Sequence, residues 1–262
     1  MRIISNGFSN LIYVHPVRTA GTSIESFLDG SELNINKTKY THCTLDQYSL
    51  SHPEDVNYRA ISFIRDPFDW VKSIYLKIRI TSQSDRLQKA RYDIMGLSNF
   101  DSFLEYILAL DFPPLQCLLY SKIISSGEII LSERISLFEY LDFVGFEMVL
   151  SKFLGQQVYM VNQISSLNST SSKESLSIPQ NLKERLEEKF KPDFLVYQFL
   201  KNNCLSLPPT LRLPGWIRLS EKQKKMVVKL SYRIDPWWWT RSSEMLPYLD
   251  CPRTNLLQPM LI

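Results

Sequence analysis

The segment Asn10-Leu-Ile-Tyr-Val-His-Pro-Val-Arg-Thr-Ala-Gly-Thr-Ser-Ile-Glu-Ser-Phe-Leu28 is the part of the sequence that says most about the fold. Residues 10–15 form a short, nearly continuous apolar run, which is typical of a buried β-strand. A loop over residues 16–21 follows, and apolar side chains then recur with helical spacing at Ile24, Phe27 and Leu28. The segment therefore predicts a strand, a tight loop and a helix in succession.

The same order recurs further along the chain. Residues 59–64 (RAISFI) form a second apolar run, and Arg65-Asp-Pro67 ends it before a helical pattern over residues 68–80. Proline suits the first turn of a helix, where its missing N–H is not needed. Apolar strands that lead directly into helices favour an α/β fold, with a parallel sheet covered on both faces.

The remaining chain continues this mixture of elements. We expect a helix at 99–110, a strand at 141–146, a helix at 147–154 ended by Gly155, and a helix at 181–202 kinked at Pro192. Prolines 208, 209 and 214 mark a change of character near residue 205. The sequence predicts one domain over residues 1–205, and a mostly helical C-terminal extension over residues 206–262 that packs on it.

Composition narrows the class of protein. A length of 262 residues with 44% hydrophobic residues suits one sizeable globular domain, and the net charge of +3 gives no reason to expect nucleic acid as a partner. The four cysteines lack metal-ligand spacing, so we expect reduced thiols and no metal site. No apolar run approaches a membrane span, and the first residues lack the apolar core of a signal peptide. We therefore expect a cytoplasmic protein.

The loop before the first predicted helix has the chemistry of a phosphate site. A helix N-terminus offers free N–H groups and the positive end of the helix dipole to an anion. Gly21 permits close approach of the backbone to a ligand, and Arg18 adds a fixed charge with forked donors. Hydroxyl donors come from Thr19, Thr22 and Ser23. The alternative is a helix cap rich in serine and threonine that has an arginine nearby by chance.

This loop, HPVRTAGTS at residues 15–23, resembles the 5′-phosphosulfate-binding loop of sulfotransferases that use 3′-phosphoadenosine 5′-phosphosulfate (PAPS). It is most similar to the carbohydrate sulfotransferase branch, whose motif reads roughly H-I-P-K-T-A/G-G-T-S. The proline stands one place early, at Pro16, and Arg18 replaces the lysine of the family. The resemblance implies that residues 18–23 (Arg18, Thr19, Ala20, Gly21, Thr22 and Ser23) bind the cofactor. It also implies that Arg18 steadies the departing phosphate.

The second strand-to-helix junction extends the resemblance. Arg65-Asp-Pro-Phe-Asp-Trp-Val-Lys-Ser-Ile-Tyr75 is similar to the 3′-phosphate motif of the family, R-D-P-x-x-R-x-x-S-x-Y. Arg65 and Ser73 are the residues that would bind the 3′-phosphate, whereas Trp70 occupies the place of the second arginine. The alternative is that the Arg-Asp-Pro sequence only caps a helix and that Ser73 is solvated. Weaker similarity at residues 41–47, 142–147 and 193–197 carries the resemblance to about residue 200.

The resemblance also implies a catalytic base, a fold and a reaction. Histidine suits proton abstraction near neutral pH, and His42 lies between the two phosphate motifs, where the family has its base. The expected fold is a three-layer, P-loop-like α/β domain with a central parallel sheet. The expected reaction moves a sulfuryl group from PAPS to a hydroxyl-bearing acceptor, with a carbohydrate as the acceptor that this branch suggests.

Two other functions remain open at this point. A nucleotide-dependent phosphoryl transferase would need a Walker A loop, GxxxxGK[ST], and a carboxylate for magnesium, and neither is evident in the sequence. A non-catalytic relative that binds a nucleotide or a glycan would explain why Arg18 replaces the family lysine. The sequence leaves the oligomeric state undetermined.

Overall fold

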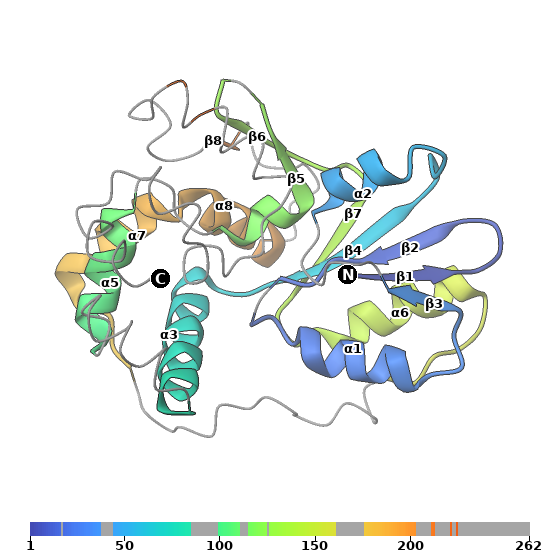
Figure 1. Ribbon diagram of the computed structural model, residues 1–262, viewed down its shortest axis with the longest axis horizontal. Coiled ribbons are helices and arrows are strands. Elements are labelled where there is room, and N and C mark those ends of the chain that lie inside the picture. Colours follow the sequence, from blue (N-terminus) through green and yellow to red (C-terminus); the bar gives the residue numbers. More distant parts are fainter. Residues whose placement is uncertain are drawn as a thin grey trace, which may run out of the picture.

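The computed structural model describes residues 1–16, 18–37, 44–84, 99–110, 115–124, 126–160, 176–202, 211–212, 221 and 224. Its main sheet has five strands in the order β3-β1-β2-β4-β7 (Figure 1). The strands are β1 (Arg2–Ser5), β2 (Asn10–Tyr13), β3 (Ile35–Lys37), β4 (Arg59–Ile64) and β7 (Ile135–Glu139). Strands β2, β4 and β7 run parallel, while β1 is antiparallel to both of its neighbours. The expected α/β fold is therefore confirmed, with a sheet that is mostly rather than wholly parallel.

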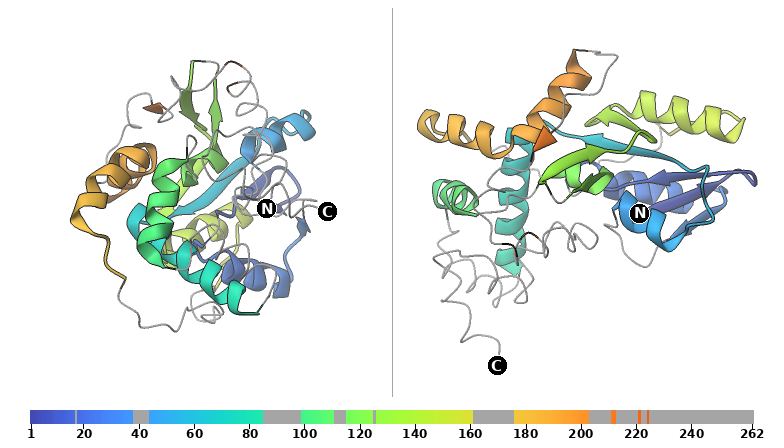
Figure 2. Two further views of the ribbon diagram at one scale, coloured as in Figure 1. Left: turned by 60° about the vertical axis from the view of Figure 1, so that its left-hand side comes forward. Right: turned by 90° about the horizontal axis from the view of Figure 1, so that it is seen from above.

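Helices flank this sheet. They are α1 (Gly21–Gly30), α2 (Leu45–Ser51), α3 (Pro67–Ser84), α5 (Phe100–Ala109), α6 (Phe143–Leu154), α7 (Gln180–Lys189), α8 (Lys191–Lys201) and the 3₁₀ helix η1 (Gln116–Tyr120). On β4, Ile61 and Phe63 point into the core shared with α1 and α6. Ala60 and Ile64 point into the larger core on the other face, shared with α3, η1 and α8. This alternation gives the sheet a separate core on each face. The right-hand view of Figure 2 shows α3, α5, α7 and α8 grouped to one side of the sheet.

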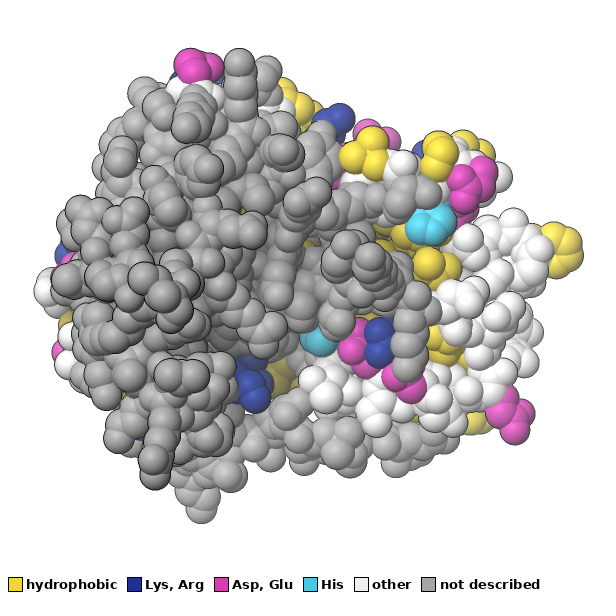
Figure 3. All heavy atoms as spheres, in the orientation of Figure 1, with side chains coloured by type: hydrophobic (Ala, Val, Ile, Leu, Met, Phe, Trp, Pro, Cys, Tyr) yellow, Lys and Arg dark blue, Asp and Glu magenta, His cyan; other side chains and the backbone are white. Residues whose placement is uncertain are grey.

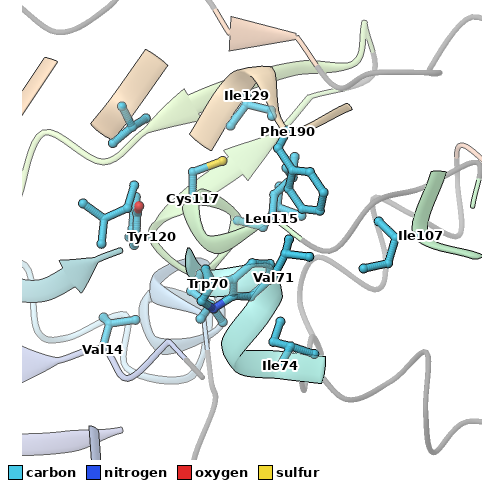
Figure 4. Packing of buried hydrophobic residues seen from close by; sticks show 14 of the residues in the cluster. Val14, Trp70, Val71, Ile74, Ile107, Leu115, Cys117, Tyr120, Ile129 and Phe190 are labelled. Atoms are coloured by element: carbon cyan, nitrogen blue, oxygen red, sulfur yellow. The ribbon is translucent and has the colours of Figure 1, made fainter. Parts of the chain in front are cut away.

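The larger core is built around the first turns of α3. Trp70, Val71 and Ile74 are nearly fully buried there and pack with Cys117 of η1 and Phe190 (Figure 4). The indole of Trp70 meets the ring of Phe190 edge-on at 6.2 Å. Because α3 begins directly after β4, this packing fixes the junction that carries Arg65.

Two predicted elements were wrong in type or extent. Residues 141–146 are not a strand, because the side chain of Asp142 accepts from the N–H of Gly145 at 3.0 Å and starts helix α6. The strand of this region is β7, which precedes it. The predicted helix at 181–202 is broken at Phe190 into α7 and α8, and Pro192 lies in the first turn of α8.

A second, antiparallel sheet joins β5 (Ser121–Ile123), β6 (Glu128–Leu131) and β8 (Leu211–Arg212). Strand β8 belongs to the predicted C-terminal extension, of which only residues 211–212, 221 and 224 are described. The run Trp237–Trp239 lies outside the described residues, so its predicted packing stays a prediction. None of the helices in the described ranges has the length and apolar character needed to cross a membrane.

Candidate anion site at the ends of strands β2 and β4

The first predicted loop lies where β2 ends and α1 begins, at one edge of the parallel part of the sheet (Figure 1). The N–H of Val14 donates to the carbonyl of Ile61 at 2.9 Å, and the hydroxyl of Ser62 donates to the carbonyl of Val14 at 3.0 Å. These bonds hold the start of the loop against β4. The loop and the end of β4, which carry the two motifs, are therefore tied to each other.

His15 and Gly21 close the loop by direct packing. A Cβ atom built on Gly21 would lie 1.6 Å from Nε2 of His15, so the imidazole occupies the space of a side chain. Nδ1 of His15 lies 3.3 Å from Glu25, whose carboxylate also pairs with Arg2 at 3.2 Å. Burial acts to raise the pKa of Glu25, but its interactions with His15 and Arg2 outweigh burial and lower the pKa. His15 thus supports the loop from beneath.

The backbone of the loop alternates in handedness. Arg18 and Ala20 have φ values of 64° and 61°, whereas Thr19 between them is not in the left-handed region. Such alternation turns successive N–H groups toward one concavity, and this is the arrangement that binds phosphate oxygens. Helix α1 begins at Gly21, so the first N–H groups of the helix and the positive end of its dipole lie at this concavity. The start of the helix is therefore suited to binding an anion.

The hydroxyl groups of the loop differ in their availability. Thr19 is fully buried and donates to the carbonyl of Pro16 at 2.7 Å, so its hydroxyl braces the loop. Ser23 is buried in the first turn of α1, while Thr22 beside it is exposed. Of the three predicted hydroxyl donors, Thr22 is therefore the one presented to solvent.

The second motif lies at the end of β4. Asp66 accepts from the N–H groups of Phe68 and Asp69 at 2.9 and 3.0 Å, so it caps α3. This agrees with the alternative in which the Arg-Asp-Pro sequence caps a helix. Arg65 takes no part in the cap. Its guanidinium lies 4.4 Å from the centre of the Tyr140 ring, and its buried Nε atom has no partner among the described residues. Capping alone therefore does not explain Arg65.

The two motifs meet through Arg18. Its Nε donates to the hydroxyl of Ser73 at 2.9 Å, and Nη1 of Arg65 donates to the backbone carbonyl of Arg18 at 3.4 Å. Ser73 is buried on α3 rather than solvated. The structure thus brings together Arg18, Arg65 and Ser73, which the sequence places up to 55 positions apart.

Among the described residues, no carboxylate balances the charges of Arg18 and Arg65. Burial, and secondarily the charge of Arg65, lower the pKa of Arg18 below its ordinary value. In the part of the chain that the structure describes, neither arginine forms an ion pair with a carboxylate. Two like charges held together at a partly buried point are unfavourable until an anion lies between them. The arrangement is therefore suited to binding a group with several negative oxygens.

Two predicted positions have other outcomes. Trp70, at the place of the family's second arginine, is a core residue with 1% of its surface exposed. His42 falls in residues 38–43, outside the described residues, so its assignment as the base stays a prediction. The face shown in Figure 3 carries its described charged side chains in small mixed groups rather than in one broad basic area.

Three residues that contribute to the site were missed by the sequence analysis. Gln116 bonds the backbone of Arg65, Tyr140 covers its guanidinium, and Glu25 holds His15 beneath the loop. Each acts on another residue of the site, and no local pattern around it signals this role. Comparison with known proteins adds no relative: no family model, no curated protein and no solved structure matches the chain.

Proposed function

We propose that the protein is a PAPS-dependent sulfotransferase with a P-loop-like fold, and that its acceptor is a hydroxyl group of a carbohydrate. One observation carries the proposal. The loop that starts helix α1 is joined to Arg65 and Ser73 of the second motif through Arg18, and no described carboxylate pairs with either arginine. PAPS carries anionic groups at both its 5′ and 3′ positions, which suits two adjoining anion sites.

Each part of the site has a role in this proposal. The N–H groups of residues 18–22 and the hydroxyl of Thr22 hold the 5′-phosphosulfate, as helix N-termini hold phosphates in general. Arg65 and Ser73 hold the 3′-phosphate. PAPS supplies the sulfuryl group: its S–O bond to the phosphate breaks as a new bond forms to the acceptor oxygen. Arg18 stabilises the negative charge that develops on the departing phosphate.

The acceptor proton goes to His42 in this proposal. The exchange His42→Ala is expected to abolish transfer of labelled sulfate while leaving the affinity for adenosine 3′,5′-bisphosphate within about twofold. Normal turnover by this variant would remove His42 from the mechanism. A variant that loses both turnover and nucleotide affinity would show a structural role instead.

Binding distinguishes the proposed donor from other nucleotides. Calorimetry with adenosine 3′,5′-bisphosphate, AMP and ATP should give the tightest binding for the bisphosphate, because AMP and ATP lack a 3′-phosphate. Arg65→Gln is expected to weaken binding of the bisphosphate by about tenfold to a hundredfold while leaving the affinity for AMP nearly unchanged. Arg185→Gln is the matched control, since Arg185 is an exposed arginine on α7 paired with Glu105.

The same experiments separate the alternatives. Preference for ATP over the bisphosphate would favour a phosphoryl transferase and contradict the proposal. Tight binding of the bisphosphate without sulfate transfer to any carbohydrate, lipid or phenolic acceptor would indicate a non-catalytic relative. Arg18 favours the non-catalytic alternative, because it stands in place of the family lysine and its Nε donates to Ser73.

A further inference from the structure

Helix α8 is joined to the 3₁₀ helix η1 by a buried carboxylate. Asp193, which is fully buried, accepts from the N–H groups of Gln116 and Cys117 at 2.7 and 2.8 Å. These are the first two residues of η1, whose N–H groups have no partner within the short helix. Asp193 therefore fixes the position of Gln116 from a different element.

The Gln116 side chain in turn bonds the backbone of Arg65. Its Oε1 accepts from the N–H of Arg65 at 3.0 Å, and its Nε2 donates to the carbonyl of Arg65 at 2.9 Å. One amide thus bonds both backbone groups of one residue at the point where β4 ends, and Gln116 is 1% exposed. A buried, doubly bonded amide leaves the backbone of Arg65 little freedom to shift.

A second set of contacts from α8 reaches the end of β7, next to the residue that covers Arg65. The hydroxyl of Tyr197 donates to Glu139 at 2.8 Å, and Lys201 pairs with the same carboxylate at 2.5 Å. Glu139 ends β7, and the next residue is Tyr140, whose ring lies over the Arg65 guanidinium. Helix α8 is therefore linked to Arg65 by two indirect routes, through Gln116 to its backbone and through Glu139, which is the residue before Tyr140.

We infer that Gln116, held by Asp193 of α8, is a positioning residue that determines how well Arg65 binds the 3′-phosphate. The inference rests on the proposed function, because it concerns the group that Arg65 recognises there. Neither Gln116 nor Asp193 touches the nucleotide in this scheme. They affect only the part of the affinity that the 3′-phosphate contributes, because Arg65 must be held within fractions of an ångström to bind that group well.

The test compares two ligands that differ only in the 3′-phosphate. For the full-length protein, calorimetry measures the dissociation constants of adenosine 3′,5′-bisphosphate and of AMP. Gln116→Met removes both bonds to Arg65 with little change in side-chain volume. It is expected to lower the affinity for the bisphosphate about tenfold and the affinity for AMP less than twofold. Asp193→Asn keeps one of the two acceptors for η1, so the same selective loss should be smaller.

The control variant is Tyr120→Phe, which removes a buried hydroxyl from the same 3₁₀ helix. This hydroxyl has no hydrogen-bond partner among the described residues, so neither ligand should lose affinity. Equal weakening of both ligands by Gln116→Met, or no weakening, would overturn the inference. If Gln116→Met does not fold, Asp193→Asn is tested in its place. The quantity compared is the dissociation constant of AMP divided by that of the bisphosphate.

The two proposals fail in different ways in this experiment. A wild-type protein that binds the bisphosphate no more tightly than AMP would contradict the proposed function and the inference together. A wild-type preference that survives in both the Gln116 and the Asp193 variants would contradict the inference alone.

Discussion

Gly21 shows how much of the loop depends on one residue. The imidazole of His15 fills the space where a Cβ would be, and its Nε2 would lie 1.6 Å from that atom. Gly21→Ala must therefore push a buried ring out of its place, and we expect a loss of about 1–3 kcal/mol in the free energy of unfolding. Urea denaturation measures this loss.

A matched glycine and a double variant make the Gly21 prediction specific. Gly30 closes the same helix with no atom within 4 Å of an added Cβ, so Gly30→Ala should cause no loss of stability. Combining Gly21→Ala with His15→Ala should recover part of the loss, because the ring that clashes is gone. Additive losses in the double variant would show that the two residues do not share this contact.

Arg18 illustrates a conflict between stability and binding. Its guanidinium is partly buried beside Arg65, and both burial and that charge lower its pKa. We expect Arg18→Gln to leave the ligand-free protein at least as stable, since a buried like charge is removed, while affinity for adenosine 3′,5′-bisphosphate falls by about tenfold or more. Thermal unfolding with and without the ligand checks both parts. A ligand-free variant destabilised by more than about 1 kcal/mol would contradict the argument.

At the scale of elements, the link between α8 and η1 should make stability depend on pH. Burial, opposed only in part by the N–H groups of Cys117 and Gln116, raises the pKa of Asp193 to about 6. An unfolded aspartate titrates near pH 4, so the folded state binds more protons between about pH 4 and pH 6. The free energy of unfolding that Asp193 contributes therefore falls as the pH rises through this window, and it is constant above it.

The variant Asp193→Asn isolates that contribution. Urea denaturation from pH 4.5 to pH 7.5 should show a steeper fall with pH for the wild type than for the variant. The variant should also lose stability at every pH, because an amide oxygen replaces only one of the two acceptors that η1 needs. Parallel pH profiles for the two proteins would mean that Asp193 does not titrate in this range.

The elements that the sequence predicted well are those with a strong local pattern. Strand β4 was predicted to the residue, because its apolar run is bounded by Arg59 and by the Arg-Asp-Pro turn. Residues 141–146 were mistaken for a strand since a short apolar run has no clear period, and the capping role of Asp142 was overlooked. Strands β1 and β3 were not predicted, and Gly7 with φ 87° lies in the turn that pairs β1 with β2.

The site divides in the same way. Arg18, Arg65 and Ser73 were predicted because each lies in a strand-to-helix junction with recognisable chemistry. Gln116 and Tyr140 were not predicted, since one bonds a backbone 51 positions away and the other offers only a ring face. Contacts of this kind depend on how whole elements pack, and the local sequence around them carries no sign of their partner.

At the scale of the whole molecule, the proposal requires that two separate segments act as one site. Residues 18–22 follow β2 and residues 65–73 follow β4, and the parallel pairing of these strands puts both segments at the same edge of the sheet. Adenosine 3′,5′-bisphosphate should therefore slow amide hydrogen exchange in both segments together. AMP should slow it mainly in residues 18–22, because its 5′-phosphate is the group that the start of helix α1 would bind.

Helix α6 provides the internal reference for this measurement, because it packs on the opposite face from α3. Exchange there should change only as much as global stability changes, whereas exchange at the two segments should slow further. Raising the salt concentration should weaken the effect of the bisphosphate more than that of AMP, since the bisphosphate carries more negative charge into a site with two arginines. Protection by the bisphosphate in only one segment would show that the two anion motifs, although adjacent in the structure, do not share one ligand.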